Sequence, residues 1–161
     1  MEISLNLLFW CYPIAYSIHI IEETSVAGGF INMVKEDIWS DYSIKKFFWF
    51  NTFLYFTTVL GIILYELYHG WWILFPLSFA WMFVTNGIWH LIGSVKSRRY
   101  SPGLATSPIY WILMYWIIRY NRADPTISDL QMYISFMIGL TITVLMISSL
   151  FLGSKYLSNK E

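Results

Sequence analysis

The chain has 161 residues, of which 57% are apolar, 20% aromatic and only 12% charged. Soluble domains carry roughly 25% charged residues, so the composition argues against a water-soluble domain and we expect lipid to cover much of the surface. Ten basic and ten acidic residues cancel, and no nucleic-acid partner is expected. The single cysteine, Cys11, lies in an apolar run, which excludes a disulfide framework and a zinc finger.

Five apolar segments approach the length of about 20 residues that a helix needs to cross the hydrocarbon layer. The fourth is short and contains Pro108, which is compatible with a tilted or partly re-entrant helix. No internal repeat is visible. The sequence therefore predicts an all-α, polytopic membrane helix bundle of about five transmembrane helices, folded as a single domain over residues 1–161. The five segments cover residues 3–21, 47–67, 71–93, 104–118 and 130–152.

The lysines and arginines lie mostly on one side of these segments, and cytoplasmic loops are enriched in such residues. Only Arg119 and Arg122 fall on the other side. We therefore expect a multi-pass protein with its N-terminus outside and its C-terminus in the cytoplasm, in the plasma membrane of a prokaryote. The basic residues assigned to the cytoplasmic side are Lys35, Lys45, Lys46, Lys96, Arg98, Arg99, Lys155 and Lys160.

The longest loop, between the first two segments, has apolar residues at helical spacing. Phe30 and Val34 share one face, and Lys35 and Glu36 lie on the other. This pattern predicts a short amphipathic helix around residues 29–41 that lies on the cytoplasmic leaflet.

The first segment ends in the chemically most informative residues of the chain. His19 is followed by Glu22 and Glu23, and residues three and four apart share a face of a helix. Ionisable residues within membrane spans are costly unless they are paired, and they are functional by default. We therefore expect His19, Glu22 and Glu23 to point into the bundle as one cluster.

The third segment carries matching polar residues near its predicted cytoplasmic end. Asn86 and His90 are four residues apart and share a face. At 1.5 Å per residue, His19 lies about 24 Å along its helix and His90 about 28 Å along its own. The two helices run in the same direction, so we expect both histidines at one depth, facing each other.

A basic turn follows the third segment, and it admits two interpretations. Arg98, Arg99 and Tyr100 precede a Pro-Gly turn, and such residues anchor helices at the cytoplasmic face. Alternatively, they cover the acidic cluster or bind an anionic lipid headgroup. On the second interpretation Arg99 and Tyr100, together with Asn86, are substrate-binding residues.

These residues together resemble a known family. The order of His19-Ile20-Ile21-Glu22-Glu23, Gly28-Gly29-Phe30, the pair Asn86 and His90, and Tyr100-Ser101-Pro102-Gly103 ahead of Thr106 is similar to that in the HXXEE-domain family of small integral membrane proteins. The resemblance covers roughly residues 10–118. It implies a multi-pass membrane protein in which the His-Glu-Glu motif and the downstream Asn and His are active-site or ligand positions. It implies no particular reaction.

Three interpretations of the cluster stay open. The first is an ion-pair network that anchors a helix. The second is a metal site in which His19, Glu22 and His90 bind a divalent ion such as zinc or iron. The third is a metal-free acid–base pair. The leading hypothesis is a membrane-embedded enzyme for a lipid-soluble or membrane-anchored substrate, with His19, Glu22, Glu23 and His90 as catalytic residues. The alternatives are a cation- or proton-coupled transporter and a non-catalytic membrane partner subunit. Membrane lipids are the expected surroundings in every case.

Overall fold

A computed structural model of the chain describes residues 4–26 and 29–157. Gly28 and Lys160, both named above, lie outside these residues. The described residues form six α-helices and one short 3-10 helix, with no β-strand among them. In chain order the elements are α1 (Leu5–Ser25), α2 (Gly29–Asp37), α3 (Ile44–Tyr68), η1 (Gly70–Ile73), α4 (Leu74–Ser97), α5 (Ser107–Ala123) and α6 (Asp129–Leu157).

The five predicted segments correspond to α1, α3, α4, α5 and α6, so the all-helical class is confirmed. Three helical stretches are long and apolar enough to cross a membrane, namely α3, η1 with α4, and α6. α1 carries Glu22 and Glu23 in its last turns and α5 has only 17 residues, and neither belongs to this set. Five spans therefore stay a prediction.

Local sequence signals start several of these helices. The hydroxyl of Ser4 accepts a hydrogen bond from the Leu7 amide at the start of α1, and Ser43 caps α3 through the Lys46 amide. Pro108 lies in the first turn of α5, where a proline sacrifices no helical hydrogen bond. Pro108 thus begins a helix rather than bending one.

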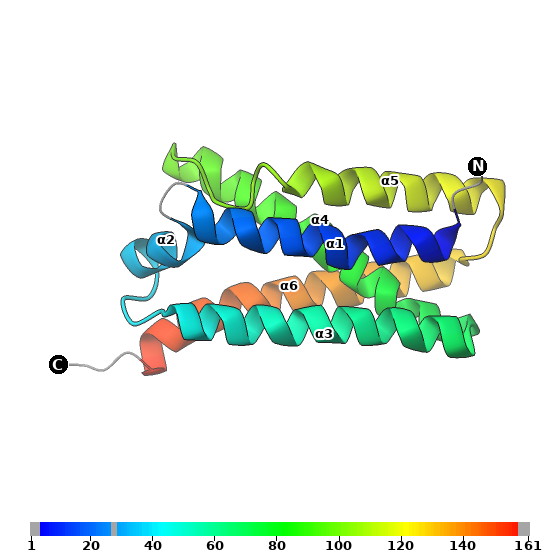
Figure 1. Cartoon of the computed structure of the whole chain (residues 1–161), viewed down its shortest axis with the longest axis horizontal. Coiled ribbons are helices and arrows are strands. Elements are labelled where there is room, and N and C mark those ends of the chain that lie inside the picture. Colours follow the sequence, from blue (N-terminus) through cyan, green and yellow to red (C-terminus); the bar gives the residue numbers. More distant parts are fainter. Residues whose placement is uncertain (1–3, 27–28, 158–161) are drawn as a thin grey trace.

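α4 is the central helix of the bundle. Figure 1 shows α1, α3, α5 and α6 running along the long axis, with α4 crossing them obliquely. α4 packs against α3, α5 and α6, and α1 packs against α3 and α5. The contact between α4 and α6 is close because Gly139 has no side chain: a Cβ atom there would lie 2.5 Å from the carbonyl oxygen of Ser78.

The predicted amphipathic helix is present as α2, and it is shorter than the predicted range of 29–41. Val34 on its apolar face is fully buried, and Trp39 and Tyr42 after the helix are buried with it. The amide of Trp39 reaches back to the carbonyl of Val34 at 2.7 Å, so the chain turns at this point instead of continuing the helix. The location of α2 on a cytoplasmic leaflet stays a prediction.

The end of α1, the start of α3 and the ends of α4 and α6 lie at the same end of the bundle (Figure 1). The described basic residues assigned above to the cytoplasm lie in these segments, directly after α4, or, for Lys35, in α2 between α1 and α3. Arg119 and Arg122 lie in the last turns of α5, at the opposite end. The structure thus separates the two groups of basic residues, while the side that faces the cytoplasm stays a prediction.

Candidate functional site

The last two turns of α1 carry three buried ionisable side chains. His19 is 1% exposed, Glu22 7% and Glu23 5%. Because α1 is flanked by α3 and α5, these side chains point into the bundle, as their shared helical face predicts. His90 of α4 is also 1% exposed and lies beside them. The ring centroids of His19 and His90 are 5.2 Å apart, which confirms the expected convergence of the two helices.

Glu23 is the carboxylate that meets both histidines. Its Oε1 atom lies 3.6 Å from Nε2 of His19 and 3.4 Å from Nε2 of His90. One ligand atom from each of the three residues lies within 4.8 Å of the others. We call His19, Glu23 and His90 the triad. Two ligands that are each about 2.1 Å from a tetrahedral zinc ion lie roughly 3.4 Å apart, so the two separations from Glu23 are close to this value, and the donor types suit zinc or iron.

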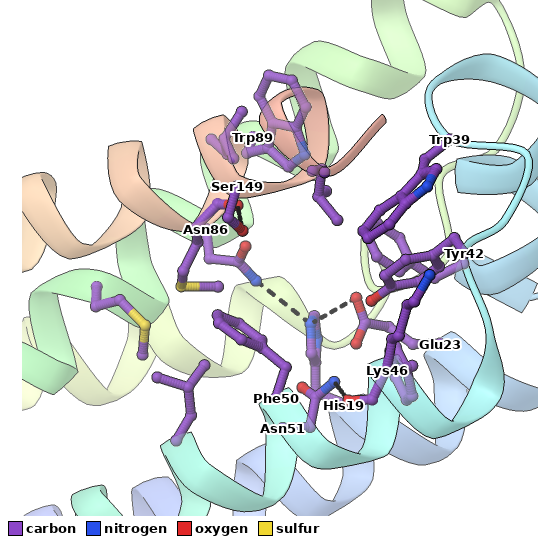
Figure 2. A pocket seen from close by; sticks show the side chains of 18 of the residues that line it. His19, Glu23, Trp39, Tyr42, Lys46, Phe50, Asn51, Asn86, Trp89 and Ser149 are labelled. Carbon is purple, nitrogen blue, oxygen red and sulfur yellow. Dashed lines mark hydrogen bonds and ion pairs between the residues drawn. The ribbon is translucent and has the colours of Figure 1, made fainter. Parts of the chain in front are cut away.

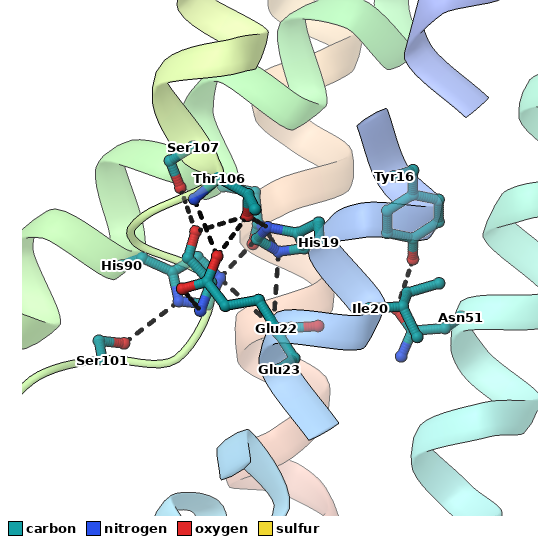
Figure 3. Close-up of polar contacts among 12 residues, drawn as sticks. Tyr16, His19, Ile20, Glu22, Glu23, Asn51, His90, Ser101, Thr106 and Ser107 are labelled. Atoms are coloured by element: carbon teal, nitrogen blue, oxygen red, sulfur yellow. Dashed lines mark hydrogen bonds and ion pairs between the residues drawn. The ribbon is translucent and has the colours of Figure 1, made fainter. Parts of the chain in front are cut away.

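Hydrogen bonds from the loop before α5 assign the tautomer of His19. Nδ1 of His19 lies 2.7 Å from Oγ1 of Thr106, and this hydroxyl donates its proton to Glu22 at 2.6 Å. Thr106 can therefore only accept from the imidazole. The neutral form of His19 therefore carries its proton on Nδ1, and its Nε2 atom faces Glu23 (Figure 3).

His90 has a similar support. Its Nδ1 lies 3.2 Å from the hydroxyl of Ser101, so a hydroxyl from the same loop holds each ring by the nitrogen that points away from Glu23. Metal-bound histidines characteristically have such a partner on the second ring nitrogen, which fixes the ring orientation. The loop between α4 and α5 thus presents both Nε2 atoms to one point.

Glu22 has a different role from Glu23, because the same loop surrounds it. Its Oε1 accepts from the amides of Gly103 at 2.8 Å and Ala105 at 3.0 Å, and from the hydroxyl of Tyr100. Its Oε2 accepts from the amide and the hydroxyl of Thr106. The Glu22 carboxylate thus accepts five hydrogen bonds from the residues that precede α5. These donors and the dipole of α5 stabilise its negative charge. Glu22 therefore holds the loop in place.

Gly103 fits between this loop and the two histidine rings. A Cβ atom there would lie 2.7 Å from Cε1 of His19 and 2.7 Å from Cε1 of His90. The residue also has φ = +102°, which favours glycine. No other residue type can bring the backbone this close to both rings without a shift of the site.

Two asparagines line the approach to the triad. The side-chain amide of Asn86 lies 3.3 Å from Nε2 of His90 and 3.5 Å from Nε2 of His19, as expected from its position one turn before His90. Asn51 of α3 accepts a hydrogen bond from Tyr16 and donates one to the carbonyl of Phe47 at 2.8 Å. Asn51 thus links α1 to α3 beside the site.

The basic turn does not cover the acidic cluster. Arg99 lies at the surface, 3.9 Å from the carboxylate of Glu36, and no described ion pair joins Glu22 or Glu23 to a lysine or arginine. Tyr100 does reach the cluster through its bond to Glu22. Partial burial and this hydrogen bond raise the pKa of the Tyr100 hydroxyl, which keeps it protonated as a donor. A role of either residue in substrate binding stays a prediction.

Two members of the triad, His19 and Glu23, line a cavity of about 550 Å³, and His90 is not among its lining residues. Figure 2 shows His19 between Asn86 and Glu23, with Lys46 and Tyr42 near Glu23. Apolar side chains from α3, α4 and α6 make up most of the remaining wall. A buried polar group next to an apolar cavity is the usual composition of a ligand site.

The residues that the sequence analysis did not assign to the site are Ser101, Gly103 and Thr106. They hold or contact both histidines. All three belong to the segment that carries the family resemblance, and this was the only indication of their importance in the sequence. Residue spacing within a loop does not predict which side chains its residues contact. Only the fold of the loop brings them to the rings.

Comparison with known proteins identifies the family. The family described as "Protein of unknown function with HXXEE motif" matches residues 10–118, a range that holds α2, α3, α4, the triad and the loop around Glu22. No curated protein and no solved structure gave a significant match. Because the match covers well over half of the 161 residues, the chain belongs to the HXXEE family.

Proposed function

We propose that the chain is a multi-pass membrane enzyme that acts on a lipid-soluble or membrane-anchored substrate with the help of a divalent metal ion, zinc or iron. The observation that carries this proposal is the triad: two imidazole nitrogens and one carboxylate oxygen within 4.8 Å, beside a largely apolar cavity. Two histidines and one carboxylate with room for a further ligand are typical of catalytic zinc and iron sites.

The proposed ligands are His19, Glu23 and His90. Glu23 replaces Glu22 in the set expected from the sequence, because five donors from the loop before α5 already occupy both carboxylate oxygens of Glu22. A bound metal would supply a Lewis acid and activate a water molecule. Thr106 and Ser101 would keep both Nε2 atoms aimed at the ion, and Asn86 would orient a substrate oxygen from the cavity side.

The surroundings support a substrate taken from the membrane. The cavity wall is mostly apolar, with Phe50, Leu54 and Met82 among its residues. Three helical stretches of the chain are long and apolar enough to cross a bilayer. We propose that α1 and α5 also span, which gives five spans with the triad toward the cytoplasmic face of a prokaryotic plasma membrane.

Metal analysis of detergent-purified protein tests the proposal. The wild-type protein should contain close to one zinc or iron ion per chain, and His90→Ala should lose it. His69→Asn is the matched control, because His69 is the remaining histidine of the chain and lies in the loop between α3 and η1. A folded wild-type protein that neither contains zinc or iron nor takes it up would overturn the metal site and leave acid–base chemistry by Glu23 and the histidines.

A further inference from the structure

A second cavity lies further along α4, with lining residues close in sequence to those of the first. Its volume is about 530 Å³, and its lining, which includes Trp71, Trp72 and Phe75, is almost entirely apolar. Both cavities are lined by residues of α3, α4 and α6. On each of these helices, a residue of the first cavity is three or four positions from a residue of the second. These pairs are Leu54 and Thr57, Met82 and Phe79, and Met146 and Ile142.

Residues three or four apart on a helix are neighbours on one face. The linings of the two cavities are therefore adjacent along α3, α4 and α6, and we call the two cavities together the furrow. From Trp89 in the first cavity to Phe75 in the second, α4 advances about 21 Å at 1.5 Å per residue. Half of the hydrocarbon layer of a bilayer is only about 15 Å thick. The furrow is longer than this, so it has the length for a long hydrocarbon chain.

Among the lining residues, His19, Glu23 and Lys46 belong to the first cavity, whereas the polar residues of the second are the uncharged Thr57 and Ser78. Lys46 is the one lysine or arginine among the described residues that line the first cavity, and Tyr42 lies next to it (Figure 2). The ammonium group of Lys46 donates to the carbonyl of Asp41 at 2.8 Å and lies 3.9 Å above the ring of Trp39. An ammonium has three donors, so Lys46 is held in place with hydrogen-bonding capacity for a ligand.

We propose that the furrow binds a single-chain lipid with an anionic head. The head lies at Lys46 and the triad, and the hydrocarbon tail follows α4 past Met82 to Phe79. This inference rests on the proposed function in taking the cavity beside the triad as the substrate cavity, and it names the class of substrate. Lipid that merely fills a gap in the bundle would show no preference for head charge and no register along α4.

Photo-crosslinking tests the register of the tail. Two fatty acids, dodecanoic and octadecanoic, each carry a diazirine at the last carbon and are added to the detergent-solubilised full chain. The octadecanoic probe should label the second cavity, at Phe79 or Ile142, and the dodecanoic probe should label the first, at Met82 or Met146. Labelling of both probes only at lipid-facing positions such as Phe53 and Phe56, which are 64% and 66% exposed, would overturn the furrow.

Blocking the junction of the cavities gives a second readout. Met146→Trp should abolish labelling of the second cavity by the long probe while the short probe still labels Met82. Leu145→Trp is the matched control, because Leu145 is the adjacent residue of α6 and is 63% exposed; it should label like the wild type. Equal labelling of the second cavity in both variants would overturn the path past Met146.

The head group is tested with the same long tail. Lys46→Met should weaken labelling by the octadecanoic probe about tenfold, as expected for the loss of one charge-assisted contact, and leave an octadecanol probe unaffected. Lys45→Met is the control, since Lys45 is exposed and does not line the furrow. Equal labelling of the wild type by acid and alcohol would overturn the anionic head. Because labelling needs no turnover, a wild-type protein that labels correctly but neither contains zinc or iron nor takes it up would refute the metal-dependent enzyme and leave the furrow standing.

Discussion

The imidazole rings of His19 and His90 meet edge to face, at an interplanar angle of 72°, although they come from helices that do not follow one another in the chain. Glu23 faces both rings, and the loop before α5 holds both from behind through Thr106 and Ser101. The site therefore depends on three elements at once: the end of α1, the end of α4 and the loop that joins α4 to α5.

The two adjacent glutamates should respond differently to the same substitution. Glu23→Gln should reduce metal content, because it removes the charged ligand, with a small effect on thermal unfolding. Glu22→Gln should lower the free energy of unfolding by about 1–3 kcal/mol, because it weakens charge-assisted bonds from the loop. Metal analysis and thermal unfolding in detergent separate the two effects. If Glu22→Gln removed the metal without destabilising the chain, the assignment of roles would be reversed.

Gly103→Ala should disrupt the site through its backbone. The substitution places a methyl group 2.7 Å from carbon atoms of both histidine rings and requires φ = +102°, which costs on the order of 1–2 kcal/mol for a residue other than glycine. Both metal content and the unfolding temperature should fall.

Gly93→Ala is the matched control for Gly103→Ala. Gly93 lies within α4, and a Cβ atom there would have only one neighbour, the Ser101 hydroxyl at 3.8 Å. Alanine favours the helix, so this variant should be as stable as the wild type or more stable. Equal losses in both variants would show that the contact of Gly103 with the rings is unimportant.

The hydroxyl of Tyr110 is fully buried and has no hydrogen-bond partner among the described residues. Tyr110→Phe removes a polar group that has lost its water without gaining a partner, so thermal stability should stay the same or rise. Tyr16→Phe is the contrast, because Tyr16 donates to Asn51; it should cost about 1 kcal/mol. A loss of stability in Tyr110→Phe as large as that in Tyr16→Phe would reveal a partner for Tyr110.

Reporter fusions test the proposed orientation. Fusions after Glu161 and within residues 95–103 should report the cytoplasm, and fusions near residue 123 the outside, because the basic residues are distributed eight to two between the two sides. An external C-terminus would reverse the orientation and place the triad toward the outside.

The sequence by itself determined the helices and the level of the site. Apolar runs, capping serines and Pro108 are local signals, and the shared face of His19 with both glutamates follows from helical spacing. The matched depth of His19 and His90 follows from the rise per residue. These features do not depend on which helices are neighbours.

Only the tertiary structure decided the roles of the two glutamates. Glu22 and Glu23 are three and four residues after His19, and both spacings allow contact with it. The loop before α5 separates them: the amides of Gly103, Ala105 and Thr106 saturate Glu22 and leave Glu23 to the histidines. The two cavities are equally non-local, because residues of α3, α4 and α6, which are distant in sequence, line both of them.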